Sequence, residues 1–382
     1  MTQGMSFTYN DTVTLQRTIS GLIKVINPQE IPLQKLLGMN KHKTTKMEAW
    51  GNNKYAWLQD TLRVRTDTLA EALDNSETDV DVTDGTLWKK GDVFKVDDEK
   101  FWVASIATNT LTTLRGWGDT DAATHDSGAT ITYLFNARLE GAANNDSQYT
   151  VPTEITNYTQ IFHGSLSVSG SEQAAMRYGI TDTRKYRMMK LIGGLGSGDG
   201  KMGDAGDLMI DLESTFFHGE KIARSSGVAG SMGGFETFVT TNVTDLNGDT
   251  LDPNTLSDAI GAAWGYGRPD LIVCGNHGKK KINSFYQGLA RTDRAESTGG
   301  VVISKIHTDY GDLDILMHKG CPSDRIYITQ KNLLGWGTVR DWTEEALGKT
   351  GDSTETQIIG EFGFILENER AHAYIKGMNT TA

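Results

Sequence analysis

The stretch from Leu251 to Lys376 constrains the fold most, because helix and strand signals alternate through it without a low-complexity gap. Asp252 and Pro253 open it with a helix-capping residue and a proline at the first helical position. Residues 270–275 form a short apolar run that is typical of a buried strand. A second helix is expected from Asn276, and apolar residues then recur with a period of two, which predicts further strands. The sequence therefore predicts a mixed α/β platform in this stretch.

Composition narrows the class of protein. At 382 residues the chain is long enough to bury a sizeable core. Its formal net charge of −12 argues against a protein whose main task is to grip phosphate backbones. The two cysteines, Cys274 and Cys321, are too few for a disulfide scaffold, so reduced thiols in a cytoplasmic setting are expected. Residues 1–10 lack the pattern of a signal peptide, and no long apolar run predicts a membrane span.

The N-terminal region, residues 1–49, combines one amphipathic stretch at 15–26 with two prolines four positions apart, Pro28 and Pro32. The prolines prevent a single uninterrupted helix, and the apolar residues around them have little local core on which to pack. Taken by itself, this pattern is typical of an irregular segment at the edge of a subdomain.

An alternating segment, residues 62–65, predicts a strand, and Ser165–Val168 is predicted to be its partner. The residues between the two must leave and return to nearly the same place, so they are expected to form an insertion. The alternation also puts Arg63 and Arg65 on one face of the predicted strand.

The insertion, about residues 77–135, has the pattern of a small β module, with short strands separated by turn residues. Five-stranded barrels of this size often bind single-stranded nucleic acid. However, the stretch holds eleven carboxylates against five basic side chains, a net charge of −6, which makes a phosphate-tracking groove a poor fit. The expected core consists of Val93, Val96, Val103, Ile106, Leu111, Leu114, Ile131 and Tyr133.

Two helices are predicted after the insertion. Thr181 and Asp182 can cap the first, and Asp204 or Asp207 can cap the second. Between them, residues 193–206 contain seven glycines, each of which costs about 1 kcal/mol relative to alanine inside a helix. We therefore expect an interruption rather than one continuous helix.

Motifs for catalysis and ligand binding are incomplete. The glycine run ends in Gly200-Lys201, but Leu195 and Met202 stand where a phosphate loop needs a glycine and a magnesium-binding hydroxyl. Residues 245–249 begin like a calcium loop, but its turn glycine and bidentate carboxylate are missing, and an Asx-rich turn explains the pattern more simply. The eight histidines are dispersed, without metal-ligand spacing. We predict no catalytic residue, no metal site and no cofactor.

Several phrases of the sequence resemble, in order, the axial and peripheral domains of a tailed-bacteriophage major capsid protein. None of them is a catalytic motif, and the resemblance extends over most of the chain. The phrases are residues 263–273, 280–285, 309–313 and 347–353, followed by Glu361, Glu367 and Asn368.

The resemblance implies an α+β fold of the tailed-phage major capsid type. Its parts are expected to be an N-terminal arm reaching across a neighbouring subunit (1–49), an extended β-hairpin loop (50–76 and 136–165), a β-barrel-like insertion domain (77–135), a peripheral domain with an interrupted spine helix (166–250), an axial α/β domain (251–350) and a C-terminal return to the peripheral domain (351–382). The glycine-rich interruption departs from the usual pattern of the family.

The function implied by the resemblance is structural, not enzymatic: an icosahedral shell around the double-stranded DNA genome of a tailed phage, located in the virion and assembled in the host cytoplasm. Implied partners are copies of the chain as hexamers and pentamers, scaffold, portal and cement proteins, and packaged DNA without sequence-specific binding; no membrane partner is expected. Arg63 and Arg65 are candidates for charge pairs with an adjacent subunit. Two alternatives stay open, an encapsulin-type bacterial compartment shell with a cargo pocket and an acidic cytoplasmic α/β enzyme.

Overall fold

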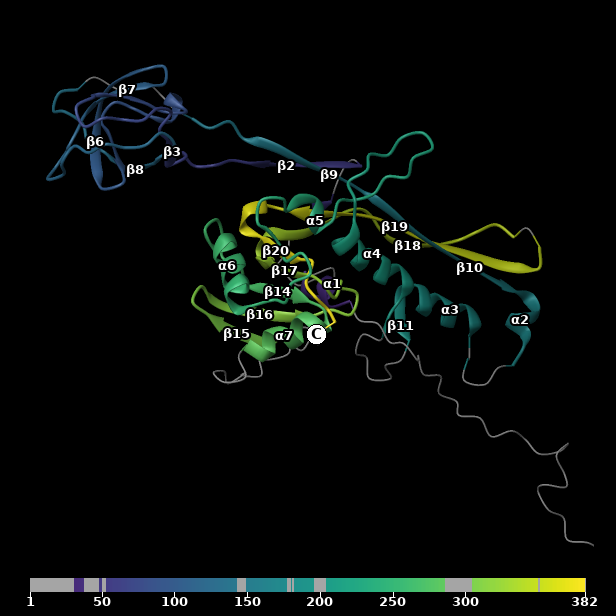
Figure 1. Cartoon of the computed structure of the whole chain (residues 1–382). Coiled ribbons are helices and arrows are strands. Elements are labelled where there is room, and N and C mark those ends of the chain that lie inside the picture. The colour runs from purple at the N-terminus through teal and green to yellow at the C-terminus, as the bar shows by residue number, and fades with distance from the viewer. Residues whose placement is uncertain are drawn as a thin grey trace, which may run out of the picture. The chain divides into compact units, whose positions relative to one another are not determined.

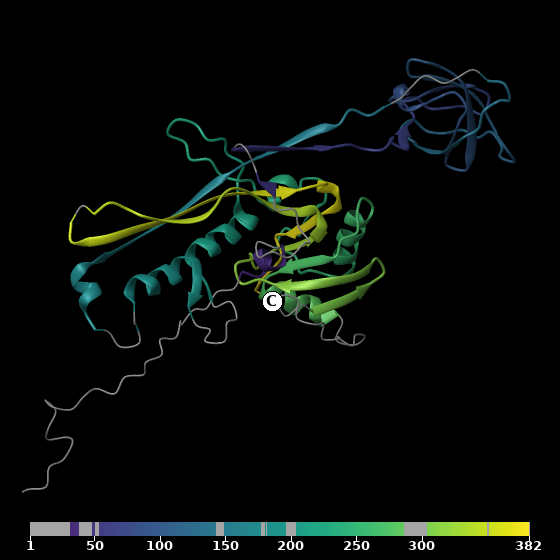
Figure 2. The same cartoon turned by 180° about the vertical axis from the view of Figure 1, so that it is seen from behind.

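The chain forms two compact units, Leu58–Ile155 and the remainder, residues 1–57 with 156–382. Figure 1 shows the elements of both units, and Figure 2 shows them from behind. The computed structural model describes residues 31–37, 48–49, 53–142, 149–176, 180, 182–195, 204–285, 304–349 and 351–381.

The predicted α/β platform is a six-stranded mixed sheet with two helices. Its elements are β13 (Val243–Asp245), α6 (Pro253–Trp264), β14 (Leu271–Cys274), α7 (Asn276–Phe285), β15 (Ser304–Thr308), β16 (Gly311–Met317), β17 (Ile326–Thr329) and β20 (Ala373–Lys376). The strand order is β13-β20-β17-β14-β16-β15, and β14 runs parallel to β16 and antiparallel to β17. All four residues of β14 are buried. Ile272 and Cys274 pack with α6 and α7, whereas Leu271 and Val273 belong to a second core.

The start of α6 follows the capping chemistry that the sequence predicts. The Asp252 carboxylate accepts a hydrogen bond from the backbone N–H of Asn254 at 2.8 Å, and Pro253 lies in the first turn. A cap of this kind stabilises a helix by about 1 kcal/mol. The helix buries one stripe of side chains, which are Leu256, Ala259, Ile260 and Ala263. The predicted helix and the buried strand after it are both confirmed.

A second, four-stranded sheet has the order β1-β18-β19-β10. The strands are β1 (Glu48–Ala49), β10 (Gln160–Ser169), β18 (Leu334–Ala346) and β19 (Ser353–Leu366). Here one prediction is wrong: Ser165–Val168 lies in β10, but β10 pairs with β19, with Leu166 opposite Thr356. Residues 60–65 form no strand, because an alternating sequence favours an extended backbone without choosing a hydrogen-bonding partner.

The predicted interruption of the spine is present. Helix α3 (Thr183–Ile192) ends at Gly193, which has φ 113°, and helix α4 (Asp207–His218) begins after Gly206. The Asp182 carboxylate caps α3, as predicted, by accepting from the backbone N–H of Lys185 at 3.1 Å. Between the helices, β11 (Gly193–Leu195) and β12 (Asp204–Ala205) pair antiparallel. Residues 196–203, which include the Gly200-Lys201 pair, lie outside the described residues.

The cap predicted for α4 is wrong. Its N-cap is Gly206, which offers no side-chain hydrogen bond, whereas Asp204 lies in β12 and Asp207 is the first helical residue. A Cβ atom at Gly206 would lie 2.3 Å from the backbone carbonyl carbon of Ile192. Close passage of the two chain segments therefore selects glycine at this position over a capping side chain.

The short helix α1 (Pro32–Leu36) is buried in the core of its own chain. Leu33 is 0% exposed and Leu37 is 1% exposed, and both belong to the core that contains α4, β14, β18 and β19. The expectation that the apolar residues of this region have little local core is therefore wrong for residues 31–37. Residues 1–30 lie outside the described residues.

The unit Leu58–Ile155 contains a six-stranded barrel, the module. Its strands are β3 (Thr66–Thr68), β4 (Asp79–Asp81), β5 (Asp92–Val96), β6 (Glu99–Ala107), β7 (Thr110–Leu114) and β8 (Thr130–Asn136). The order is β3-β8-β5-β6-β7-β4, and the edge strands are joined by backbone hydrogen bonds from Ala70 to Asp81 at 2.8 Å and from Thr83 to Thr68 at 3.1 Å. These bonds close the sheet into a ring.

The interior of the module matches most of the expected core. Val96, Val103, Leu111 and Ile131 are fully buried there. Leu114 is 57% exposed, and Val93, although buried, does not belong to this core. Along the chain, the module is preceded by β2 (Lys54–Gln59) and followed by β9 (Thr153–Tyr158), which pair in a two-stranded sheet. The remaining short elements are α2 (Gly170–Ala174), α5 (Phe235–Phe238) and three 3-10 turns at Gly85–Leu87, Lys331–Leu333 and Glu369–Ala371.

Candidate functional site

Two extended segments of the unit Leu58–Ile155, which we call the loop stem, expose large apolar side chains. They are residues 58–65 and 149–155. The Thr150 hydroxyl joins them, with its Oγ1 atom 2.6 Å from Asp60 Oδ1 and 2.8 Å from the Thr61 carbonyl oxygen. Exposure reaches 92% for Leu62 and 83% for Tyr149. An isolated chain gains nothing from exposing such side chains, so the loop stem is a candidate contact surface.

The structure brings Arg63 and Arg65 together over one ring. Their guanidinium carbons lie 4.4 and 5.7 Å from the ring centroid of Tyr133. Arg63 is already occupied within the chain, because it donates to the carboxylate of Asp92, which is fully buried, and to the carbonyl oxygen of Leu87. Arg65 is exposed. Of the two predicted contact residues, Arg65 therefore presents the more accessible charge.

A groove of about 700 Å³ lies beside these arginines. Its walls come from loop-stem residues 60–64 and 149–150 and from Thr86, Leu87 and Lys89 of the module. The groove combines apolar side chains of the stem, Leu62 and Val64, with the charged side chains of Asp60, Arg63 and Lys89. This composition suits a polypeptide segment of another chain better than a reactive small molecule.

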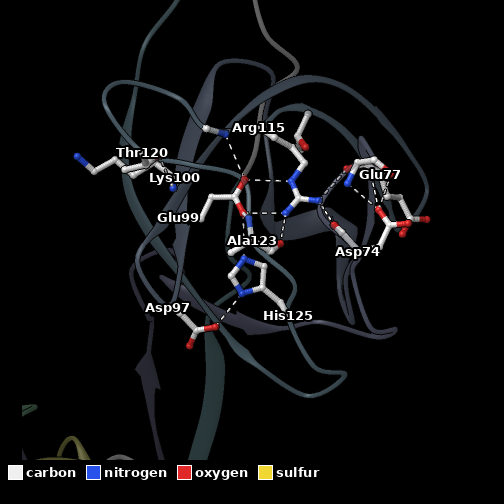
Figure 3. A network of polar contacts seen from close by, with 12 residues as sticks. Asp74, Glu77, Asp97, Glu99, Lys100, Arg115, Thr120, Ala123 and His125 are labelled. Carbon is white, nitrogen blue, oxygen red and sulfur yellow. Dashed lines mark hydrogen bonds and ion pairs between the residues drawn. The ribbon is translucent and has the colours of Figure 1, made fainter.

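A buried ion network holds one end of the module together (Figure 3). Arg115 Nη2 lies 2.7 Å from Glu99 Oε2, and the Arg115 Nε donates to Glu99 Oε1 at 3.0 Å. The backbone N–H groups of Gly116 and Ala123 donate to the same carboxylate at 3.1 and 3.0 Å. Burial opposes ionisation of Glu99, but Arg115 and these N–H groups outweigh it and hold the pKa of Glu99 at about 2.

His125 extends the network to a second carboxylate. Its Nδ1 lies 2.7 Å from Asp97 Oδ2, and its Nε2 lies 3.0 Å from Glu99 Oε2. Both ring nitrogens thus face carboxylate oxygens. The network contains no nucleophile beside a base, so its geometry supports a structural role.

A second buried carboxylate lies in the other unit. Glu213, on α4, accepts a hydrogen bond from the backbone N–H of Leu33 and lies 3.2 Å from His318 Nε2. Burial raises the pKa of Glu213, although His318 and the N–H groups of Leu33 and Gln34 act against it. Glu213 therefore ties helix α1 to the spine helix inside the core.

Neither network was identifiable from the sequence. Glu213 lies in an amphipathic helix whose charged residues show no unusual pattern, and the residues that contact Glu213 are far away in the sequence. Asp97 and Glu99 have the local pattern of a turn. Within the described residues, no group of three or more His, Cys, Asp or Glu side chains is arranged to hold a metal ion. No helix of that same part of the chain is long and apolar enough to cross a membrane.

Comparison with known proteins decides the family. The family model described as "SU10 major capsid protein" matches residues 1–379. The chain belongs to the SU10 major capsid protein family. This is therefore a major capsid protein of a phage shell, and the expected tailed-phage capsid fold is confirmed.

Several solved structures are similar to this capsid protein at low sequence identity, and the first of them shares its fold. The capsid of a native GTA particle is 7% identical, with a TM-score of 0.52 over 99% of this chain and 100% of that one. The capsid of Myoviridae phage XM1 is 10% identical, with a TM-score of 0.47 over 99% and 100%. The SrpI encapsulin of Synechococcus elongatus is 9% identical, with a TM-score of 0.43 over 63% and 79%. No curated protein matches the chain.

Proposed function

We propose that copies of this capsid protein assemble into an icosahedral shell that encloses the double-stranded DNA genome of a tailed phage. The observation that carries the proposal is the match of the capsid family model to residues 1–379, nearly the whole chain. The fold shared with the GTA particle capsid over 99% of the chain supports it.

The exposed loop stem supports the role of an assembling subunit. Leu58, Leu62, Tyr149 and Val151 are each at least 72% exposed in the single chain. Burying such side chains stabilises an interface by about 1.5–3 kcal/mol per residue. On this proposal, the extended loop (50–76 and 136–165) buries its apolar side chains against a neighbouring subunit, and Arg65 pairs with a carboxylate there. Arg63 acts mainly within its own chain, through Asp92.

The remaining parts take the roles that the family resemblance implies. Residues 1–49 form an arm, 77–135 an insertion domain, 166–250 the peripheral domain, 251–350 the axial domain and 351–382 the return. The burial of α1 in its own core anchors such an arm at residues 31–37.

The shell is proposed to consist of hexamers and pentamers of this chain, assembled in the host cytoplasm with scaffold, portal and cement proteins. Packaged DNA is held without sequence-specific binding, and the chain catalyses no reaction. With a net charge of −12, the protein repels phosphate backbones at long range, which fits a container better than a DNA-binding protein.

The test is light scattering of the purified full chain, followed by electron microscopy of fast-sedimenting material. Hollow particles or capsomers are the expected result. A homogeneous species of 41.8 kDa, at concentrations where related shell proteins assemble and with scaffold protein supplied, contradicts the proposal.

A further inference from the structure

The outer face of the module carries a row of apolar side chains that its own core does not use. Strand pairing aligns Phe135, Val93, Trp102 and Leu114 across β8, β5, β6 and β7. The next residues along β5 and β6, Phe94 and Phe101, point into the barrel core. Because side chains alternate along a strand, the aligned row faces outward.

This outward row is partly exposed and rich in aromatic rings. Phe135 is 45% exposed and Leu114 is 57% exposed, whereas Val93 beneath them is fully buried. The ring of Trp117 packs edge-on against Phe135, with 5.7 Å between centroids. Aromatic residues at the centre of an exposed patch are typical of a protein interface.

Two lysines lie on the same outer face. Lys95 and Lys100 are paired directly across β5 and β6, two residues along the strands from Val93 and Trp102. Lys95 Nζ is 3.0 Å from Asp98 Oδ1, an exposed pair that water screens strongly. The β5–β6 face thus combines an apolar centre with two lysines, next to the exposed carboxylates of Asp97 and Asp98 at the turn between the strands.

The opposite face of the barrel is acidic. In the closed ring of six strands, β5 lies across from β4, and β6 lies across from β3. Residues 71–81, which lead into and form β4, carry five carboxylates and no basic residue. Figure 3 shows Lys100 on one side of the Glu99–Arg115 pair and Asp74 and Glu77 on the other. The acidic residues are Glu71, Asp74, Glu77, Asp79 and Asp81.

We propose that the module binds a second copy of this chain head to tail, with the β5–β6 face of one module seated against residues 71–81 of its neighbour. The unit Leu58–Ile155 contains eighteen carboxylates and eight basic side chains, so like faces brought together repel. A head-to-tail contact instead joins opposite charges, and repeated around an axis it closes a ring. This inference rests on the proposed shell function, which brings many copies of the module together.

The experiment is zero-length carbodiimide crosslinking of assembled wild-type particles, with linked peptides identified by mass spectrometry. Amide links from Lys95 or Lys100 to carboxylates of residues 71–81 are expected, in bands of two or more chains. Because the two faces lie on opposite sides of one barrel, such a link joins two chains. If particles form without these links, the head-to-tail contact is wrong but the proposed shell function is not affected. The same holds if the lysines are linked to other segments or to other proteins.

Charge reversal provides the matched control. In Lys95→Glu/Lys100→Glu, the threshold concentration for stable particles is expected to rise at least about tenfold. Adding Glu77→Lys/Asp79→Lys to the same chain restores opposite charges and is expected to recover most of that loss. Lys305→Glu/Lys349→Glu, at two exposed lysines of the other unit, controls for net charge because it reverses the same number of charges. Equal effects of all three variants overturn the proposal, and a wild-type chain that forms no particles overturns the shell function itself.

Discussion

Arg115 and Glu99 form an ion pair at 2.7 Å with only 6% and 1% of their side chains exposed. The pair connects β6 to the end of β7, and Arg115 also donates to the carbonyl oxygens of Asp74 and Glu77. A buried carboxylate needs such partners, because desolvation otherwise outweighs the attraction between the charges. The loops around residues 74–77 and 116–125 are therefore held by this pair and not by apolar packing alone.

Removal of Arg115 is expected to destabilise the module strongly. Arg115→Met leaves the Glu99 carboxylate buried without its cation, which costs about 3–5 kcal/mol. Hydrogen exchange of the β5–β7 amides in the full chain measures this loss of local stability. The double variant Glu99→Met/Arg115→Met is the control, since it removes both charges and is expected to recover much of the loss. A single variant as stable as the wild type contradicts the prediction.

Acid is expected to weaken the module through Glu99. The folded-state pKa of Glu99 is about 2, below its ordinary value of 4.5. A carboxyl group with a lowered pKa contributes stability above its unfolded-state pKa and loses that contribution as the pH falls through its folded-state pKa. Unfolding free energies from pH 6 to pH 2 are expected to fall by on the order of 3 kcal/mol through this group. Glu99→Gln is expected to remove this pH dependence of the unfolding free energy. If the pH dependence is unchanged in the variant, Glu99 is not its source.

Features fixed by local chemistry were predictable from the sequence. The Asp252 and Asp182 caps, the buried strand β14 and the break in the spine follow from residues within one or two turns of the feature. The prediction that Leu114 lies in the core of the module is wrong, because it was based on the apolar character of the residue alone. Side chains alternate along a strand, so Leu114 points outward when Leu111 and Thr113 point inward. The capsid family itself followed from phrases spread over most of the chain.

Features fixed by tertiary contacts were not predictable in the same way. Strand β10 pairs with β19, which lies nearly two hundred positions away in the sequence. Nothing in the sequence of residues 62–65 or 165–168 shows that residues 165–168 pair with β19 and not with residues 62–65, as we expected. Gly206 replaces a capping side chain because another segment passes close to it. Glu213 acquires its role only when α1 and His318 reach it from distant parts of the chain.

Glu213 is expected to make the anchoring of α1 sensitive to pH in the direction opposite to Glu99. Burial raises the pKa of Glu213, so its stabilising contribution is complete below the unfolded-state pKa and is lost as the pH rises through the folded-state pKa. The free energy of unfolding of Glu213→Gln relative to wild type, measured in urea, is expected to be higher at pH 7 than at pH 4. Leu33→Ala serves as the control and is expected to cost about 2–5 kcal/mol at both pH values. A pH-independent effect of Glu213→Gln contradicts the prediction.

Substitutions of Arg63 and Arg65 are expected to affect different properties, the stability of the module for Arg63 and the assembly of particles for Arg65. Arg63→Ala leaves the buried Asp92 carboxylate without its cation and is expected to cost about 2 kcal/mol of module stability. Arg65→Glu is expected to change unfolding by less than about 0.5 kcal/mol, because its side chain is exposed. On the proposed function, however, Arg65→Glu reduces particle yield in sedimentation assays. Normal assembly of Arg65→Glu removes Arg65 as a contact residue.

Leu62 offers the most direct test of the loop stem, because it is 92% exposed in the single chain. Leu62→Asp therefore leaves the free energy of unfolding within about 0.5 kcal/mol of wild type. If the loop stem is buried between subunits, the same change places a charge in an apolar interface and raises the particle-forming concentration by at least about tenfold. Met176→Asp, fully exposed outside the loop stem, is the matched control and is expected to assemble like the wild type. Equal assembly of both variants excludes Leu62 from the interface, whereas a loss confined to Leu62→Asp shows that the stem carries the contact.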